Sequence, residues 1–429
     1  MRLSIIILLL LSKELVCSIM STDEPQSVQV KLIAEDFLGE NKKQDTEVLD
    51  KILNNPDKII SSDFVIPAGL KNRVLFWAKI YSIYPSSSYV IHDKDDLSII
   101  YKVVNTSDNT KKLSQGGERD NVKKIIEKAY KAKSIKEFYP RSQDEKNIYF
   151  IVKRKHKNKN LSAILSGLRT QSGQKDFIVE GIKISSRYLP LMEDIFKEHD
   201  LPWELTRIPF VESSFNIRAD SKVGARGIWQ IMGVTGKKFL GVDSNYDERY
   251  SPFKASIVAA KLLEENYKIL GTWPLAITAY NHGPGGLRSA VKKLGTKDIT
   301  KIIDNHKSNT FGFASKNFYS EFLAALYVTV YSDIIFGKID KQPLMNFFYV
   351  EMMEDMKVSN LLGITELSQK DILKYNPELG KKIMNNEMPI KHGSMIKLPP
   401  RASYRLEEYF ERYLDKKNLE KELRKRDKK

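Results

Sequence analysis

The segment FVESSFNIRADSKVGARGIWQIM, from Phe210 to Met232, carries residue types that could perform acid–base chemistry. Glu212 directly follows an apolar run, Ile208 to Val211, so its carboxyl group is expected to be partly buried. Burial disfavours the charged carboxylate and raises its pKa, as a general acid working near neutral pH requires. The alternative interpretation is an ordinary glutamate at a helix end, because acidic side chains mostly face water.

Asp220 is the nearest other carboxylate in this segment. Glycosidases generally use two carboxylates, either as acid and base or as acid and nucleophile. We predict that Asp220 structures the loop, because Asp favours turns of this kind. In DERYSP, Asp247 and Glu248 are predicted to cap the helix that follows. The segment therefore offers a single carboxylate, Glu212, for chemistry.

Two further clusters supply polar groups that could hold a substrate. GARGIWQIM combines two glycines with the amide of Gln230, and its last five residues are predicted to begin a helix. AYNHGPGG ends a helix in a glycine-rich turn that leaves Tyr280 and Asn281 free to face a cleft. Taken singly, an amide between apolar neighbours, a core tyrosine and a capping asparagine also fit structural roles. The six histidines show no HExxH or paired ligand spacing, so no metal or cofactor is predicted.

The elements that position these residues are predicted to form an all-helical unit over residues 177–342. Its clearest helix is SPFKASIVAAKLLEENYKILG, where Ser251 suits the N-cap, Pro252 the first turn and Gly271 the end. Apolar spacing predicts the residues that this helix buries. These are Ile257, Ala260, Leu263 and Tyr267.

The flanking regions have different patterns. Residues 22–176 are predicted to form a mixed α/β region of unknown role, with helical spacing from Val74 to Tyr84 and strand-like SYVIHDKDDLSIIYKVV after it. TQSGQKD, residues 170–176, is predicted to be a linker, and the basic run VKRKHKNKN a solvated helix face or loop. Residues 343–400 are predicted to form a strand, a helix pair and a second strand. Residues 401–429 form a charged tail.

Four segments together resemble the catalytic domain of lytic transglycosylases, the lysozyme-like enzymes that cleave bacterial peptidoglycan. They are LPWELTRIPFVESSFN, GARGIWQIM, DERYSPFKAS and WPLAITAYNHGPGG. The resemblance covers at least Ile182 to Tyr331 and is nearest to the membrane-bound type D branch, whose final active-site helix is similar to GFASKNFYSEFLAAL. It implies a mainly α, lysozyme-like catalytic domain. Gly233 departs from the proline that the family often has at that position.

The resemblance also implies roles for the site residues. Glu212 corresponds to the catalytic acid, and Ser213 belongs to the same motif. The remaining matches are the residues that line the family's sugar cleft and the two that form its AYN signature. These are Ser221, Gln230 and Met232 for the cleft, and Tyr280 with Asn281 for the signature.

The family's chemistry explains why one carboxylate can suffice. Lytic transglycosylases use no water: the acid, here Glu212, protonates the oxygen leaving C1 of N-acetylmuramic acid. The C6 hydroxyl of the same sugar then attacks C1, the glutamate takes its proton, and a 1,6-anhydro end is left. The N-acetyl group can stabilise the cationic intermediate, and Tyr280 would orient the reacting groups or stabilise charge. An intramolecular nucleophile replaces the activated water that makes hydrolases keep a second carboxylate.

Two alternatives stay open at this point. One keeps the fold but makes the protein a muramidase that hydrolyses the same bond with water. The other is a non-catalytic scaffold that binds the cell wall, against which the combination of Glu212, Gln230 and Tyr280 counts.

The segment after the helical unit resembles a LysM module, the small βααβ domain that binds N-acetylglucosamine polymers. GITELSQKDILKYNP is similar to its helix pair and HGSMIKLP to its last strand. The usual opening Gly-Asp-Thr/Ser-Leu run is replaced by MMEDMKVSNLL. The alternative is a small structural cap on the catalytic domain.

Composition indicates a globular protein with an anionic partner. The 429 residues are 41% hydrophobic and 10% aromatic, enough for a core in two or three domains. Lys and Arg outnumber Asp and Glu by 70 to 54, a formal charge of +16. That excess fits nucleic acid, an anionic membrane surface, or a wall polymer with free carboxylates.

The first residues, MRLSIIILLLLSKELVCSIMS, predict a signal peptide over residues 1–21, with an uncleaved anchor as the alternative. Cys17 is the chain's single cysteine, so no intrachain disulfide is expected. Lipidation of Cys17 is not favoured, because Glu14 to Val16 lack the small residue that normally precedes a lipidated cysteine. Export to the periplasm or cell envelope favours peptidoglycan glycan strands over nucleic acid as partner. Membrane association and oligomeric state stay open.

Overall fold

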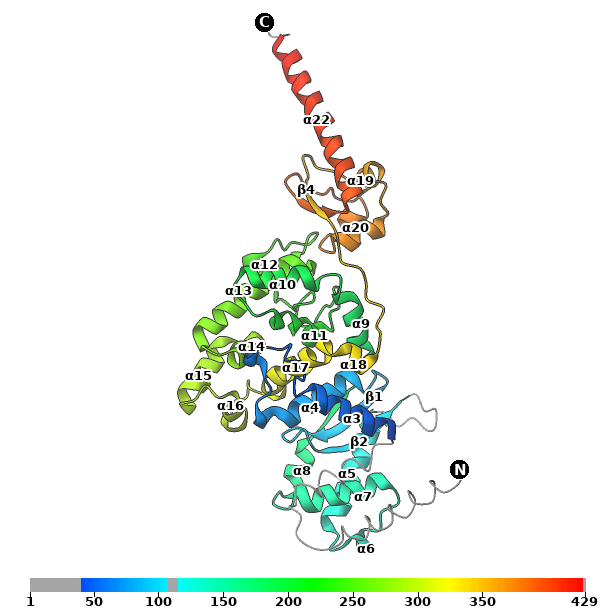
Figure 1. Cartoon of the computed structure of the whole chain (residues 1–429), viewed down its shortest axis with the longest axis vertical. Coiled ribbons are helices and arrows are strands. Elements are labelled where there is room, and N and C mark those ends of the chain that lie inside the picture. Colours follow the sequence, from blue (N-terminus) through cyan, green and yellow to red (C-terminus); the bar gives the residue numbers. More distant parts are fainter. Residues whose placement is uncertain (1–39, 107–114, 427–429) are drawn as a thin grey trace, which may run out of the picture. The chain divides into compact units, whose positions relative to one another are not determined.

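Helices dominate the computed structural model, which describes residues 40–106 and 115–426 (Figure 1). The predicted mainly α fold is confirmed, and the strands within these ranges form one three-stranded and one two-stranded sheet. The predicted signal peptide, with Cys17, lies outside the described residues. In the described part of the chain, no helix is both long and apolar enough to cross a membrane.

The three-stranded sheet belongs to the N-terminal region and has β1 (Ser88–Asp93) at its centre, between β2 (Ile100–Asn105) and β3 (Leu168–Ser172). Both pairings are antiparallel. The predicted linker at residues 170–176 is wrong, because its first residues belong to β3 and pair with β1. Since β1 is buried along its whole length, the backbone groups at both of its edges need partners. Pairing with β1, which is distant in the sequence, therefore makes the mostly polar segment Leu168–Ser172 a strand.

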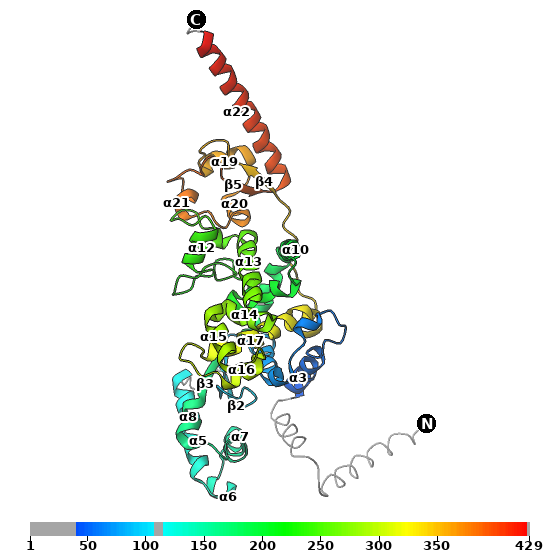
Figure 2. The ribbon, with the colours of Figure 1, turned by 90° about the vertical axis from the view of Figure 1, so that its left-hand side faces the viewer.

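A helical insertion lies between β2 and β3 in the sequence. It contains α5 (Gln115–Lys131), α6 (Ile135–Phe138), α7 (Gln143–Phe150), a π-helical turn (Ile151–Lys155) and α8 (Leu161–Gly167). α5 and α7 pack side by side (Figures 1 and 2), and the insertion shares a hydrophobic cluster with one face of the sheet. The basic run at residues 152–160 is mostly exposed, as predicted, although His156 is buried within it.

The predicted helical unit is present. Its helices are α9 (Lys175–Ser185), α10 (Leu189–Glu198), the 3-10 helix Trp203–Arg207, α11 (Ile208–Ser213), α12 (Gly233–Phe239), the 3-10 helix Glu248–Tyr250, α13 (Pro252–Leu270), α14 (Trp273–His282), α15 (Pro284–Leu294), α16 (Ile299–Asn305), α17 (Phe313–Val330) and α18 (Ser332–Phe336). The predicted limits of α13 are confirmed, with Ser251 at the N-cap and Gly271 in the left-handed conformation at the end.

α17 is the central helix of this unit and is buried along most of its length. It is apolar on nearly every side, as a helix enclosed by neighbours must be. α4 (Lys71–Ser82), from the N-terminal region, packs along it. Arg73 donates to the Asn317 side chain at 3.0 Å, and the Trp77 and Phe313 rings lie 6.3 Å apart.

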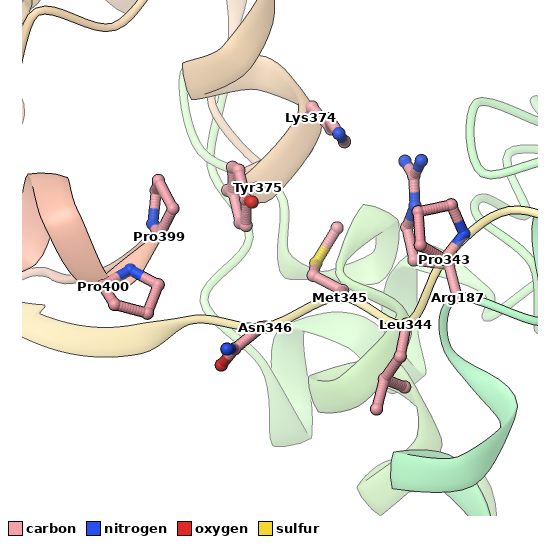
Figure 3. A pocket seen from close by; sticks show the side chains of 9 residues that line it. All are labelled: Arg187, Pro343, Leu344, Met345, Asn346, Lys374, Tyr375, Pro399 and Pro400. Atoms are coloured by element: carbon pink, nitrogen blue, oxygen red, sulfur yellow. The ribbon is translucent and has the colours of Figure 1, made fainter.

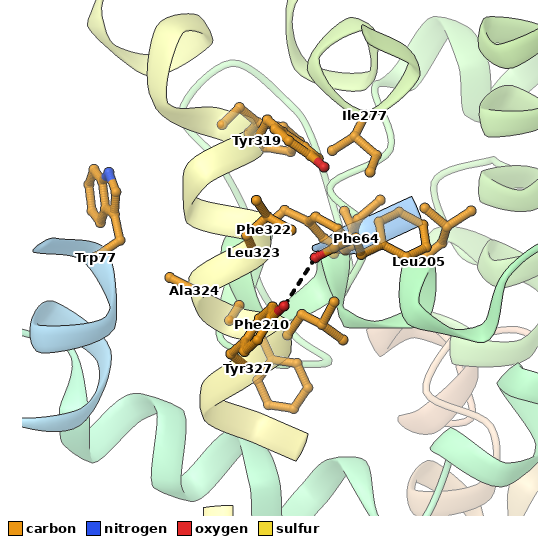
Figure 4. Close-up of a cluster of buried hydrophobic side chains, with 14 of the residues drawn as sticks. Phe64, Trp77, Leu205, Phe210, Ile277, Tyr319, Phe322, Leu323, Ala324 and Tyr327 are labelled. Atoms are coloured by element: carbon orange, nitrogen blue, oxygen red, sulfur yellow. Dashed lines mark hydrogen bonds between the residues drawn. The ribbon is translucent and has the colours of Figure 1, made fainter. Parts of the chain in front are cut away.

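The chain before α4 joins the same core. α3 (Glu40–Ile52) and the 3-10 turns Ser62–Phe64 and Ala68–Leu70 precede α4. The Phe64 and Phe322 rings are 5.6 Å apart, and the Tyr327 hydroxyl donates to the Phe64 carbonyl at 3.3 Å (Figure 4). Residues on both sides of position 176 therefore build one hydrophobic core.

The C-terminal module has the predicted order of strand, helix pair and strand, with one extra short helix. Its elements are β4 (Phe348–Glu351), α19 (Val358–Thr365), α20 (Gln369–Tyr375), α21 (Lys381–Met384) and β5 (Met395–Leu398), followed by α22 (Pro400–Arg426). β4 and β5 pair antiparallel around a separate hydrophobic cluster. Lys397 forms an ion pair with Glu378 in which both side chains are about 1% exposed.

An extended segment leads from α18 into this module. The backbone N–H groups of Gln342 and Met345 donate to the carbonyls of Lys183 and Arg187. Figure 3 shows a pocket beside this segment. It is lined by Arg187, Pro343, Leu344, Met345, Asn346, Lys374, Tyr375, Pro399 and Pro400.

Candidate active site

Glu212 lies in the last turn of α11, where the chain reverses direction. Ser214 and Phe215 end the helix with positive φ angles of 49° and 61°. Their N–H groups donate to the carbonyls of Phe210 and Pro209, both at 3.1 Å. Phe215 is fully buried, so the packing of its ring stabilises a backbone conformation that is otherwise unfavourable. This turn fixes the backbone that carries Glu212.

The carboxyl group of Glu212 is half-buried and has no hydrogen bond or ion pair within residues 40–106 and 115–426. Burial raises its pKa from 4.5 to about 8. At neutral pH the group is therefore mostly protonated. A protonated carboxyl that is not bound to another side chain can donate its proton to a substrate.

Ser213 and Tyr280 hold the following loop from two sides. The Ser213 hydroxyl donates to the carbonyl of Ile228 at 3.0 Å, and the Tyr280 hydroxyl donates to that of Trp229 at 2.8 Å. Burial raises the pKa of Tyr280 well above its usual value, and the nearby Glu212 raises it further. The motif residues on α11 and α14 thus clamp the GARGIWQIM segment next to Glu212.

The GARGIWQIM segment is a tight loop, and the prediction that its last five residues begin a helix is wrong. Gln230 has a φ of 47°, and α12 begins only at Gly233. Gly227 has a φ of 74°, and a Cβ there would lie 1.9 Å from the carbonyl oxygen of Arg249. Left-handed residues and close backbone approach, which glycine permits, keep the segment out of a helix.

The polar site residues of this loop bind its own backbone. Ser221 Oγ accepts from the N–H of Ala225 at 2.8 Å, and Gln230 Nε2 donates to the carbonyl of Gly227 at 2.9 Å. Met232, in contrast, is 45% exposed. The amide nitrogen of Gln230 therefore shapes the loop, whereas Met232 is accessible to a ligand.

A buried ion-pair network anchors the loop. Arg249 donates through Nη1 to the carbonyl of Gly224 at 2.8 Å and through Nη2 to Asp247 at 2.7 Å. Arg226 Nη1 donates to the same oxygen of Asp247, Oδ2, at 2.9 Å. Asp247 also accepts from the N–H of Arg249 and so caps the 3-10 helix Glu248–Tyr250, not α13 as predicted, whose N-cap is Ser251. Asp220 accepts from the Tyr250 hydroxyl at 2.5 Å. Asp220 thus has the loop-structuring role that the sequence predicted.

Asn281 ends α14 with an exposed side chain. Its Oδ1 accepts from Ser315 on α17 at 3.1 Å. This bond links the end of the AYN motif to the central helix and leaves the Asn281 amide nitrogen for other partners.

Sequence reasoning missed a second carboxyl group, Glu321 on α17. Burial and the charge of Glu212 raise the pKa of Glu321, Arg169 lowers it, and the net result is a pKa of about 8. Tyr81 on α4 is near both carboxyls as well. Burial raises the pKa of Tyr81 well above its usual value, and the charges of Glu321 and Glu212 contribute to this increase. The available signal was a glutamate in an otherwise apolar helix, since such helices rarely carry an acid without reason.

No metal site accompanies these groups. Within the two described ranges, no three His, Cys, Asp or Glu side chains gather as ligands of a metal ion would.

Comparison with known proteins gives one family match that includes Glu212 and three similar relatives. A family model described as the Transglycosylase SLT domain matches residues 193–303. The membrane-bound lytic murein transglycosylases D of Escherichia coli strain K12 and strain O6:H1 are each 37% identical over 98 residues. That alignment covers 22% of this chain and 22% of each relative.

A putative tributyltin chloride resistance protein of Alteromonas sp. strain M-1 is 31% identical over 112 residues, 26% of this chain and 54% of that protein. This chain thus matches only about a fifth of the length of the two E. coli relatives. The match to the Transglycosylase SLT domain includes Glu212 and Tyr280. The chain is also similar, over 98 residues, to membrane-bound lytic murein transglycosylase D.

Proposed function

We propose that the protein is a peptidoglycan lytic transglycosylase that cleaves the β-1,4 bond between N-acetylmuramic acid and N-acetylglucosamine without water. The observation that carries the proposal is the unpaired, half-buried Glu212 with its pKa near 8, within the segment that matches the Transglycosylase SLT domain. Such a carboxyl is protonated before the reaction and becomes an effective base once it has lost its proton.

The proposed reaction has two proton transfers through one group. Glu212 gives its proton to the glycosidic oxygen, and the bond from this oxygen to C1 of N-acetylmuramic acid breaks. The C6 hydroxyl of the same sugar then forms a bond to C1 while its proton passes to Glu212. A 1,6-anhydro end and a free 4-hydroxyl on N-acetylglucosamine result, and the enzyme returns to its starting protonation state.

Tyr280 and the loop it binds would hold the sugar against Glu212. The Tyr280 hydroxyl is occupied by the Trp229 carbonyl, so it acts on the loop geometry. Met232, exposed on this loop, and Asn281, exposed at the end of α14, would contact sugar directly. Ser213, Ser221 and Gln230 complete the proposed set of substrate-binding residues.

Glu321 makes the hydrolytic alternative worth testing, because a muramidase needs a second carboxylate. A base must be ionised, however, and burial keeps the pKa of Glu321 near 8. At neutral pH Glu321 is therefore mostly an uncharged acid and a poor activator of water. This favours the internal C6 hydroxyl as nucleophile.

Digestion of purified sacculi, followed by mass spectrometry of the fragments, tests the proposal. Anhydro ends are expected from the parent protein, and reducing ends would instead establish a hydrolase. Glu212→Gln should lower the rate by about 100- to 10,000-fold, the usual contribution of a general acid. Glu321→Gln should still release anhydro ends, and Glu264→Gln, at a partly exposed carboxyl on α13, is the matched control. Unchanged digestion by Glu212→Gln would show that the acid is another group.

The proposed substrate requires export to the periplasm or cell envelope, consistent with the leader-like residues 1–21. The C-terminal module, with its strands β4 and β5 around two helices, is proposed to bind N-acetylglucosamine polymers as LysM modules do. Deleting residues 347–429 should then weaken binding to sacculi while fragment cleavage by the helical domain continues.

A further inference from the structure

The helical insertion between β2 and β3 holds half of the chain's excess positive charge. Residues 115–160 contain fourteen Lys and Arg against six Asp and Glu, a net charge of +8 out of +16 for the whole chain. This concentration lies away from the motifs of the proposed active site in the sequence. A strongly basic module attracts anionic partners over several ångströms.

One face of α5 presents this charge to solvent. Lys124, Lys128 and Lys131 follow one another at spacings of four and three residues, which places them along one face of the helix. All three are exposed, and none forms an ion pair within the described residues. Lys123, one residue along, differs because it is paired with Asp120 at 2.8 Å.

A hollow of about 280 Å³ opens beside this face. It is lined by Lys124, Ile125, Lys128, Phe138, Arg141 and Glu145. Lys128 Nζ lies 5.0 Å from the centre of the Phe138 ring, and this ring is fully buried and stacked on Tyr149 at 5.1 Å. The floor of the hollow is therefore fixed by the core of the insertion.

The negative charge of Glu145, the single acid that lines the hollow, is partly offset by backbone groups of the insertion. Glu145 accepts the backbone N–H of Arg141 at 2.8 Å and lies in the first turn of α7, where the helix dipole favours negative charge. The three cations Lys124, Lys128 and Arg141 have no such partner in the described residues. The hollow thus retains a net positive charge that suits carboxylate groups.

Two exposed tyrosines lie next to the hollow in sequence. Tyr139, which directly follows Phe138, is 75% exposed, and Tyr130 at the end of α5 is 38% exposed. Exposed tyrosine rings offer flat apolar faces on which sugar rings can stack. In the described part of the insertion they are also the only large apolar side chains with such exposure. A surface without exposed Leu, Ile or Phe is poorly suited to insert into a lipid bilayer.

We propose that this surface is a second binding site for peptidoglycan, in which Lys124, Lys128 and Arg141 pair with carboxylates of the peptide side chains. The exposed tyrosines would contact the glycan. The proposal rests on the proposed function and gives a role to a module whose role the sequence does not indicate. Such a site raises the local concentration of the wall polymer for the full-length protein without affecting cleavage itself.

Binding to purified sacculi tests the proposal, with the full chain carrying Glu212→Gln so that the polymer stays intact. The charge-reversal variant Lys124→Glu/Lys128→Glu/Arg141→Glu should bind sacculi up to roughly tenfold more weakly, because three exposed ion pairs are lost and three repulsions are gained. Lys292→Glu/Lys293→Glu/Lys301→Glu, with the same charge change on exposed positions of α15 and α16, should bind like the parent. Far-UV circular dichroism checks that both variants fold.

Sacculi whose carboxylates have been amidated test the ligand side. The Glu212→Gln protein without charge reversal should bind amidated sacculi as weakly as the charge-reversal variant binds untreated ones. Tyr139→Ala should weaken binding to either kind of sacculus. Equal binding of the parent and the charge-reversal variant to untreated sacculi overturns the proposal. Losses confined to phosphatidylglycerol vesicles or duplex DNA, with sacculus binding unchanged, also overturn it and identify a membrane or a nucleic acid as the partner.

A separate readout distinguishes this proposal from the proposed function. Proteins with Glu212 intact should cleave short soluble glycan fragments equally well with and without the charge reversal. If the parent cuts no fragments, the proposed function fails, while the binding result still decides the insertion surface.

Discussion

Replacing Glu212 by glutamine should stabilise the protein, and the gain should grow with pH. The folded protein keeps the Glu212 proton up to about pH 8, whereas an unfolded glutamate loses it near its ordinary pKa of 4.5. Between these values unfolding releases a proton, so the stability of the parent falls as pH rises. Glutamine has no proton to lose and avoids this cost.

The size of the effect follows from the pKa shift. Each pH unit between the two pKa values changes the free energy of unfolding by about 1.4 kcal/mol. From about pH 5 to about pH 7, the stability gain of Glu212→Gln should therefore increase by roughly 2.5 kcal/mol. Coupling to Glu321, whose pKa is also raised, would reduce this increase if both groups titrate together.

Urea unfolding monitored by tryptophan fluorescence is a suitable assay. All four tryptophans, at positions 77, 203, 229 and 273, lie on α4 or in the helical unit, so the signal reports on this core. Glu264→Gln, a change on α13 at a partly exposed carboxyl whose pKa is lowered by Lys268, is the control and should give no increase with pH. A Glu212→Gln gain that stays flat from about pH 5 to about pH 7 would refute the assignment of a buried, proton-retaining acid.

Three further predictions concern the site and the C-terminal module. The kcat/KM for sacculus fragments should fall as pH rises through about 8, because Glu212 loses the proton that it must donate; a rate that still increases above this pH would contradict the role. Gly227→Ala should abolish cleavage and lower the melting temperature, since its Cβ would lie 1.9 Å from the Arg249 carbonyl oxygen at a positive φ. Glu378→Gln should destabilise the C-terminal module by about 3 kcal/mol in calorimetry, because Lys397 is left as a buried unpaired charge; Glu387→Gln, at another acid of the module, is the control.

The helix α13 illustrates what the sequence could and could not predict. Its ends were predicted from Ser251 and Gly271, because capping residues act locally. Its buried face was predicted only in part: Ala260 and Leu263 are buried, but Ile257 and Tyr267 are each 38% exposed. The prediction used apolar spacing along one face, whereas α13 packs against several helices and buries small residues where those helices come close. These buried small residues include Ala255, Ser256 and Ala259.

Long-range contacts account for the other differences. β3 is a strand because β1 offers it an edge, and nothing in the Thr-Gln-Ser sequence signals that partner. Glu321 comes near Glu212 only because α17 packs against α11, and Tyr81 only because α4 packs against α17. Glu212 itself could be selected from the sequence, since its apolar neighbours and motif are local. Groups that come near Glu212 only through tertiary packing could not be identified from the sequence alone.

The hydrogen bonds of the loop also indicate which donor and acceptor groups the proposed cleft can offer to a sugar. Ser221 Oγ accepts from the Ala225 N–H, which leaves the hydroxyl proton free to be donated. Gln230 uses its Nε2 on the carbonyls of Gly227 and Ala219, which leaves Oε1 free to accept. The loop should therefore offer a sugar one donor at Ser221 and one acceptor at Gln230. Gln230→Glu keeps the acceptor but loses both bonds to the loop, so it should weaken cleavage by deforming the loop. Ser221→Ala removes the hydroxyl donor and also the acceptor of the Ala225 N–H, so it should weaken both substrate binding and the loop.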